Sequence, residues 1–188
     1  MRLFVAVDLS DDARQAMAGE QDRIVAALGG RQSSFKLVRP EQMHLTLVFL
    51  GRGDDDRTPA IVDAIGRDTG VAPFEMVFAD LGVFPPRGAP RVLWIGVTDG
   101  AAALVALQRE MAQRSSAVGI VLEERPFHPH LTLARWRSSH PLDRRRALAA
   151  AAPGAIASVH VDRAILYESR LSASGPTYTP LAHANLTG

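Results

Sequence analysis

The sequence predicts a mixed α+β fold of antiparallel sheets flanked by helices, arranged as two similar lobes that face each other. Strand-like and helix-like segments alternate along the 188 residues. The connections between them are too short and too varied for a regular series of parallel crossovers, which favours antiparallel sheets. One strand pattern occurs twice, which indicates approximate symmetry between the lobes. A chain of this length fits one domain, and we expect residues 1–188 to form it.

Local signals place the individual elements. In the first half, partly alternating apolar residues predict strands at residues 2–8, 36–38 and 44–50. An N-cap signal at Ser10 opens a helix that ends at Gly29-Gly30, and a second helix is expected at residues 59–69. In the second half we expect strands at residues 74–78, 81–84, 91–97, 130–136, 159–171 and 177–184, with helices at residues 101–115 and 141–151.

The composition narrows the class of protein. The chain has no cysteine, which excludes disulfides, zinc-thiolate sites and cysteine nucleophiles. It has no apolar run of about eighteen residues, and its first apolar run is too short for a signal peptide, so we expect a soluble, cytoplasmic protein without a membrane segment. A formal net charge of +1 argues against a broad electrostatic grip on long nucleic acid and, with the small size, fits a monomer.

The repeated strand pattern is His-Leu-Thr-Leu, at residues 44–47 and again at 130–133. With six histidines and eight threonines in the chain, chance gives about 0.26 His-x-Thr matches, so two matches with identical leucines are improbable. Because side chains alternate along a strand, His44 and Thr46 point one way while the leucines point the other. The same holds for His130 and Thr132. If the two lobes face each other, both pairs line one cleft.

These residues have a simpler structural interpretation and a chemical one. Histidines in strands are often hydrogen-bonded in a core or exposed on a solvated sheet face. Two imidazoles with ordinary pKa values of about 6.5 can instead serve as general base and general acid at neutral pH. Opening a cyclic phosphodiester needs both, because water loses a proton while the leaving ribose oxygen gains one. The threonine hydroxyls can donate to the non-bridging phosphate oxygens, and this chemistry requires no metal or other cofactor.

A metal site is the main alternative at the second copy of the pattern. His128 precedes His130 by two residues, a spacing that metal ligands use, and His44 could complete a three-histidine site. Pro129 separates the two histidines, so we expect His128 in the turn before the strand. The sequence therefore favours a site without metal.

The chain resembles the two-histidine (2H) phosphoesterase superfamily, and within it the RNA 2′,3′-cyclic phosphodiesterases formerly called 2′-5′ RNA ligases. The resemblance runs nearly end to end, through RLFVAVDL, HLTLVFLG, RVLWIGV, FHPHLTLAR and a tail with LYES, Gly175 and Tyr178. It implies a bilobal α+β fold with a water-filled cleft. It also implies metal-independent hydrolysis of the 2′,3′-cyclic phosphate of RNA ends or nucleotides to a 2′-phosphomonoester.

The resemblance also implies roles for particular residues. His44 would be the general acid for the departing O3′ and His130 the base for water, although the approximate symmetry makes these roles easy to exchange. Thr46 and Thr132 would hold the phosphate. Arg135 matches the family's Pro-His-x-Thr-x-x-Arg pattern, and its planar fork suits a pair of phosphate oxygens.

Phe49 matches the aromatic residue of the pattern His-x-Thr-x-x-Phe. We expect it among the substrate-binding residues, where it either contacts the nucleoside or packs beneath the site. Tyr167 and Tyr178 either line the cleft or are buried with bonded hydroxyls. Arg137 is expected on the same strand face as Arg135, where it could extend the phosphate site.

Two alternative functions remain open at this point. The same chemistry run in reverse would join a 2′,3′-cyclic phosphate end to a 5′-hydroxyl and give a 2′-5′ linkage. A catalytically silent RNA- or nucleotide-binding module is the other alternative, and the retention of both histidines and Arg135 argues against it.

Overall fold

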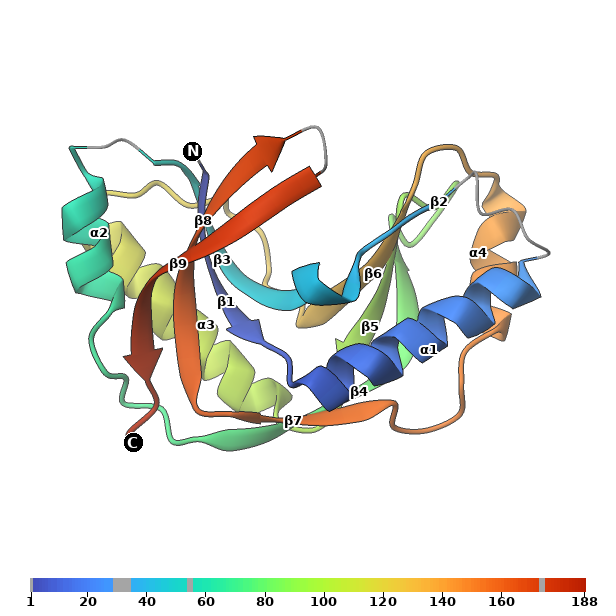
Figure 1. Ribbon diagram of the computed structural model, residues 1–188, viewed down its shortest axis with the longest axis horizontal. Coiled ribbons are helices and arrows are strands. Elements are labelled where there is room, and N and C mark those ends of the chain that lie inside the picture. The colour runs from blue at the N-terminus through green and yellow to red at the C-terminus, as the bar shows by residue number, and fades with distance from the viewer. Residues whose placement is uncertain (1, 29–34, 54–55, 173–174) are drawn as a thin grey trace.

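The computed structural model describes residues 2–28, 35–53, 56–172 and 175–188, and places their strands in two sheets (Figure 1). The first sheet has the order β3-β1-β8-β9, with β3 at His44–Arg52, β1 at Arg2–Asp8, β8 at Arg163–Ser172 and β9 at Gly175–Asn185. The second has the order β2-β6-β5-β4-β7, with β2 at Phe35–Leu37, β6 at His130–Trp136, β5 at Val92–Val97, β4 at Phe74–Phe84 and β7 at Ala157–Val161. Neighbouring strands in both sheets are antiparallel, as predicted.

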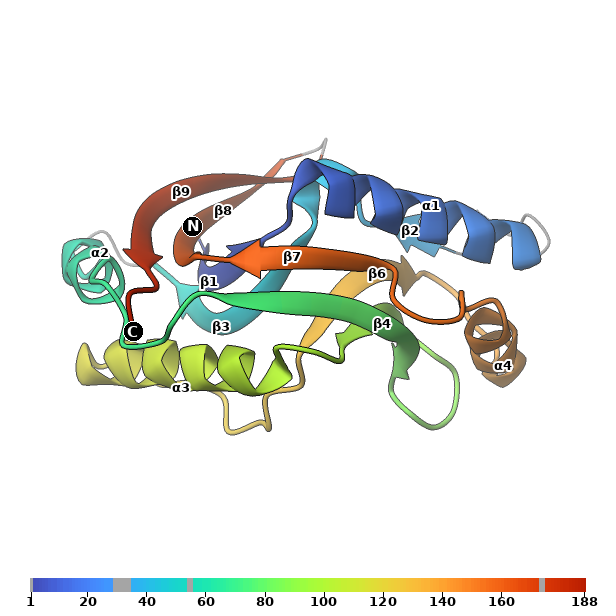
Figure 2. The ribbon, with the colours of Figure 1, turned by 90° about the horizontal axis from the view of Figure 1, so that it is seen from below.

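Two long helices each follow a strand of one sheet and pack against the other sheet, and we call them the exchanged helices. Helix α1 (Asp11–Ala27) follows β1 of the first sheet but contacts β6 and β7 of the second. Helix α3 (Ala101–Ala117) follows β5 of the second sheet but contacts β3 of the first. Figure 2 shows the two helices on opposite sides of the strands. The predicted pair of similar lobes is therefore present. Each lobe is covered by a helix that follows a strand of the other lobe in the sequence.

Two shorter helices complete the fold. Helix α2 (Thr58–Ile65) contacts α3 and β9, and α4 (Pro141–Ala149) contacts α1 and β4. A single turn of 3₁₀ helix, η2 (Pro40–Gln42), stands directly before β3. No helix in the described part of the chain is long and apolar enough to cross a membrane.

Helix α1 begins where the sequence predicts. The Ser10 side chain accepts a hydrogen bond from the Ala13 backbone N–H at 3.3 Å, which satisfies one of the free donors of the first turn. Ala13, Met17 and Ile24 recur on one face and are buried against the sheets. The predicted end of the helix at Gly29-Gly30 lies outside the described residues.

Two strand predictions are wrong, for different reasons. The segments 74–78 and 81–84 form the single strand β4, which continues through a bulge at Asp80, where φ is 61°. The expected strand 159–171 is two strands, because β7 pairs with β4 in the second sheet and β8 pairs with β1 in the first. The chain passes from one sheet to the other at Asp162.

Candidate active site

The two histidine strands bury their leucines and present their polar residues to a common side, as the strand alternation predicts. His44 opens β3 and His130 opens β6, and these two strands contact each other where the sheets meet. The leucines of both copies are buried, with exposed fractions of 0–4% for residues 45, 47, 131 and 133. Both histidines and both threonines are only half-buried.

The six residues that the sequence assigns to catalysis and substrate binding all line one cleft of about 480 Å³. Its walls come from both sheets, with η2 and Phe127 completing them. The predicted residues in its lining are His44, Thr46, Phe49, His130, Thr132 and Arg135. Arg135 is exposed, and 70% of Phe49 is exposed, so both side chains are accessible to a molecule in the cleft.

Each histidine ring is fixed by the same backbone contact. Nδ1 of His44 lies 2.8 Å from the carbonyl oxygen of Gln42, and Nδ1 of His130 lies 2.6 Å from that of His128. A carbonyl oxygen only accepts hydrogen bonds, so Nδ1 carries the proton in both rings. Nε2 is then the nitrogen that can accept or donate a proton in the cleft.

Aromatic rings pack around His44. The ring of Phe4 stacks on it with centroids 4.8 Å apart, and Tyr178 meets it edge-on at 5.0 Å. The resulting burial lowers the pKa of His44 below its ordinary value of 6.5. The carbonyl of Gln42 and the carboxylate of Asp8 partly oppose this by raising the pKa, and Arg14 lowers it.

His130 has a comparable setting built from other residues. Phe84 and Trp94 approach its ring edge-on, with centroids 5.1 and 5.9 Å away. Burial again lowers the pKa of this histidine, the carbonyl of His128 raises it, and the charges of His128 and Arg135 lower it further. The Trp94 ring lies directly over Gly82, where a Cβ atom would stand only 2.0 Å from Cζ2 of Trp94.

Helix α1 holds the backbone beside both histidine strands. The Arg14 guanidinium donates to the carbonyls of Pro40 and Met43, at 2.9 and 3.2 Å, and so fixes the turn before His44. The buried amide of Gln21 donates to the carbonyls of Val38 and Leu133, at 2.8 and 2.7 Å. One helix therefore positions the start of β3 and the middle of β6.

The predictions for the two tyrosines and for Arg137 have different outcomes. Tyr178 lines the cleft, whereas the hydroxyl of Tyr167 donates to Asp8 Oδ2 at 2.7 Å. Arg137 lies just beyond β6, which ends at Trp136, so the strand alternation that was expected to place it beside Arg135 does not extend to it.

Four residues that shape the site were not predicted from the sequence: Asp8, Arg14, Gln21 and Gln42. These residue types have no motif of their own at these positions, and they act through backbone carbonyls and neighbouring strands that only the fold brings close. The one available signal was an aspartate at the end of the predicted first strand, at residue 8.

His128 lies before β6 and outside any strand, as Pro129 predicts. Its ring centroid is 6.2 Å from that of His130. In the described part of the chain, no group of three or more His, Asp or Glu side chains is arranged to hold a metal ion.

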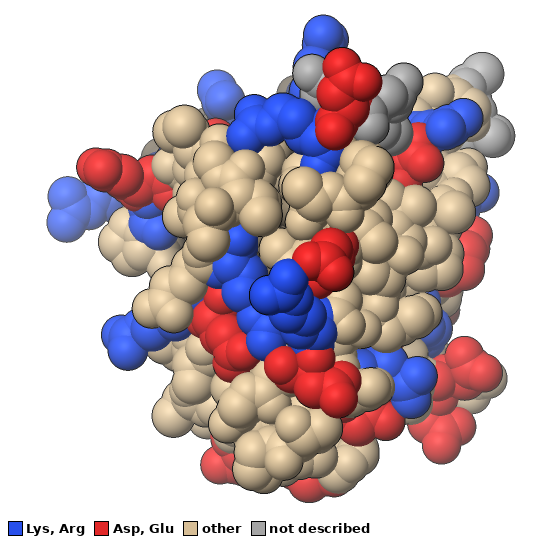
Figure 3. All heavy atoms as spheres, turned by 90° about the vertical axis from the view of Figure 1, so that its left-hand side faces the viewer, with Lys and Arg blue, Asp and Glu red and all other residues tan. Residues whose placement is uncertain are grey.

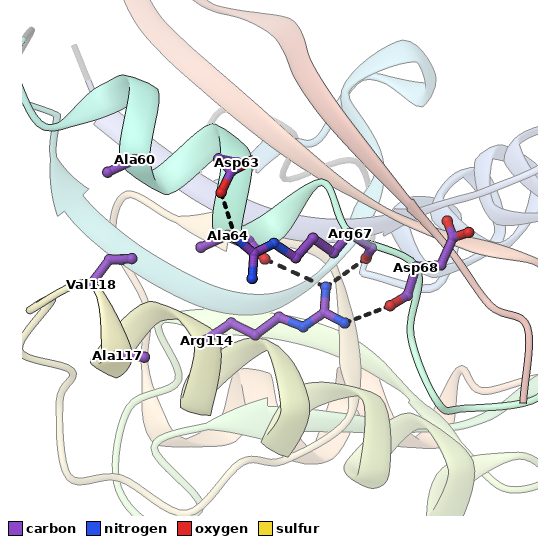
Figure 4. A pocket seen from close by; sticks show the side chains of 8 residues that line it. All are labelled: Ala60, Asp63, Ala64, Arg67, Asp68, Arg114, Ala117 and Val118. Atoms are coloured by element: carbon purple, nitrogen blue, oxygen red, sulfur yellow. Dashed lines mark hydrogen bonds and ion pairs between the residues drawn. The ribbon is translucent and has the colours of Figure 1, made fainter.

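A second hollow lies between α2 and α3, on the face shown in Figure 3, where acidic and basic side chains are interspersed. Arg114 donates there to the backbone carbonyls of Arg67 and Asp68, at 2.5 and 2.7 Å (Figure 4). It also pairs with Glu110. Arg67 pairs in turn with Asp63. Both arginines therefore stabilise the end of α2. The contacts in this hollow are those of a structural interface between α2 and α3.

An antiparallel two-sheet fold that brings two His-x-Thr strands to one cleft defines a two-histidine phosphoesterase. The chain belongs to the 2′-5′ RNA ligase superfamily, whose sequence model matches residues 11–172.

An RNA 2′,3′-cyclic phosphodiesterase of Geobacillus stearothermophilus is 32% identical over 189 residues, which cover 98% of this chain and 57% of that protein. The chain therefore spans little more than half the length of that relative. A protein of the same name from Methanothermobacter thermautotrophicus is 32% identical over 184 residues, 96% of each chain. The crystal structure of apo E. coli LigT superposes with a TM-score of 0.76 at 26% identity, covering 100% of this chain and 98% of that one.

Proposed function

We propose that this protein hydrolyses 2′,3′-cyclic phosphodiesters of RNA ends or nucleotides to 2′-phosphomonoesters, without a metal. The relatives named above, which align over nearly the whole chain, are named RNA 2′,3′-cyclic phosphodiesterases, which supports the class of substrate. The observation that carries the proposal is the pair of imidazoles in one cleft. In each ring Nδ1 is hydrogen-bonded to a carbonyl oxygen, so Nε2 is the nitrogen that can transfer a proton.

The two histidines take opposite roles in this reaction. Nε2 of His130 accepts a proton from water as the water oxygen attacks phosphorus. Nε2 of His44 donates its proton to O3′ as the P–O3′ bond breaks, so the phosphate stays on O2′. The Nδ1–H to carbonyl bond stabilises each ring when it becomes imidazolium.

The other cleft residues bind the substrate. Thr46 and Thr132 donate to the non-bridging oxygens, and the exposed fork of Arg135 pairs with the phosphate charge. Phe49 and Tyr178 offer ring faces or edges to the nucleoside.

Ligation would use the same residues in reverse. Water is present at ~55 M, so an RNA hydroxyl competes only when the two ends are held together. Hydrolysis is therefore the main reaction of the site.

The test incubates the full chain with 2′,3′-cyclic AMP and with a short RNA that ends in a cyclic phosphate, in EDTA, and identifies the product isomer by ³¹P NMR. The proposal predicts the 2′-phosphate and an unchanged rate in EDTA. A 3′-phosphate product, or loss of activity with EDTA, contradicts it.

We further propose that residues 1–188 act as one domain, and that the protein is a cytoplasmic monomer. Light scattering of the purified chain tests the monomer. A mass near 20.3 kDa supports it, and twice that mass overturns it.

A further inference from the structure

The two histidines differ in the residue that faces each of them across the neighbouring strand. His44 is paired in register with Asp8, the last residue of β1. His130 is paired with Gly96, which has no side chain to offer. Residues directly opposite each other in an antiparallel pair point their side chains to the same face, so Asp8 and His44 share the cleft side of the first sheet.

The carboxylate of Asp8 is held in place by a hydroxyl. Tyr167 on β8 donates to Asp8 Oδ2 at 2.7 Å, and the rings of Tyr167 and His44 both stack on Phe4, at 5.4 and 4.8 Å. Asp8 is itself half-buried, where solvent screens its charge less than at the surface. This arrangement places a fixed negative charge near one imidazole of the pair.

We propose that Asp8 is a positioning residue that favours the imidazolium form of His44 and thereby makes His44, not His130, the proton donor. This inference rests on the proposed function for its catalytic consequence. Asp8 acts on His44 through space and touches no reacting atom. Asp8 thereby distinguishes the roles of two histidines whose strands are otherwise similar.

The other charged and titratable groups around His44 set the strength of this effect. Arg14 of α1 opposes Asp8, because its positive charge lowers the pKa of His44. Tyr167 and Tyr178 have raised pKa values and stay neutral at physiological pH. From β6, His130 lines the same cleft.

The charged neighbours of His130 are different. The charges that act on it belong to His128 and Arg135, and both lower its pKa. The carboxylate of Asp8 raises the pKa of His44, against the lowering by burial and Arg14, and so acts in the direction that separates an acid from a base.

The test compares the wild type with Asp8→Asn, in which the amide oxygen still accepts the Tyr167 hydroxyl but the charge is gone. NMR follows the pH titration of the ring C–H of His44, identified by its loss in His44→Gln. We expect the pKa of His44 to fall by about half a pH unit or more in Asp8→Asn, with that of His130 nearly unchanged. Asp12→Asn, an exposed carboxylate in the first turn of α1, is the matched control and leaves both values in place.

Kinetics supply the second readout. In Asp8→Asn the alkaline limb of the kcat/KM profile moves to lower pH by the same amount, while the acid limb stays. A structural role for Asp8 would instead lower the rate equally at every pH and leave both limbs in place, and that result overturns the inference.

The NMR titration needs no substrate, so it separates this inference from the proposed function. An unchanged His44 pKa in Asp8→Asn refutes the role of Asp8 even in an active enzyme. A shifted pKa in a protein without cyclic phosphodiesterase activity refutes the proposed function instead.

Discussion

At the scale of single residues, proton transfer is confined to one nitrogen of each imidazole. The carbonyls of Gln42 and His128 fix Nδ1–H in both rings, so the tautomer and the ring orientation are set before a substrate enters. The sequence predicted the two His-x-Thr pairs and their common face from strand alternation alone. It could not predict Asp8 as their asymmetric neighbour, because the strand register that pairs Asp8 with His44 exists only in the fold.

The pH dependence of the free enzyme follows from the direction of both pKa shifts. Burial lowers the pKa of His44 and of His130 below 6.5. The active form carries one proton on the pair, so it is most abundant between the two lowered pKa values and declines above the higher one.

We therefore expect a bell-shaped kcat/KM profile with its maximum below pH 6.5 and a rate that falls as pH rises from 6.5 to 8. Initial rates with 2′,3′-cyclic AMP at constant ionic strength give the profile. A maximum above pH 7.5 would contradict the lowered pKa values.

At the scale of elements, α1 is the part that aligns the two strands. Local signals predicted the start of the helix at Ser10 and its apolar face, because capping and periodicity are encoded within a few residues. The exchange of α1 and α3 between the sheets was not predictable, because it depends on packing between segments far apart in the chain. The same is true of the Asp80 bulge and of the passage between sheets at Asp162.

The Gln21 amide gives a test of this alignment. In Gln21→Leu the carbonyls of Val38 and Leu133 lose their buried donor, so we expect a loss of about 1–3 kcal/mol in the free energy of unfolding. We also expect a lower kcat, because Leu133 lies in the strand that carries His130 and Thr132.

Urea denaturation and steady-state kinetics measure the two effects. Gln15→Leu makes the same change at an exposed position of α1 and should leave both within about 0.5 kcal/mol and twofold of the wild type. Equal effects of the two variants would show that Gln21 has no special role.

At the scale of the whole molecule, α1 and α3 each connect one lobe to the other. Each lobe loses a covering helix if the other unfolds, since α1 packs on the second sheet and α3 on the first. The segments around α2 and α3 also contact each other through hydrogen bonds in both directions. Arg57 donates to the carbonyls of Val118 and Gly119 at the end of α3, while Arg114 closes the end of α2.

This arrangement predicts a single cooperative unfolding transition. Trp94 and Trp136 both lie in the second sheet, so their fluorescence reports that lobe, whereas far-ultraviolet circular dichroism reports both. The two signals should give the same midpoint in urea. Two separate midpoints would show that the lobes unfold independently.

The central claim is that the two imidazoles perform opposite proton transfers on one cyclic phosphodiester. The most direct measurement compares kcat of His44→Gln and His130→Gln on 2′,3′-cyclic AMP and on the same compound with sulfur in place of O3′. A departing thiolate needs no protonation, so the sulfur compound removes the need for an acid and leaves the need for a base. We predict that each variant is slowed at least about 100-fold on the oxygen substrate, and that sulfur restores the His44 variant but not the His130 variant. Near-normal activity of either variant on the oxygen substrate, or restoration of His130→Gln alone, would contradict the assignment.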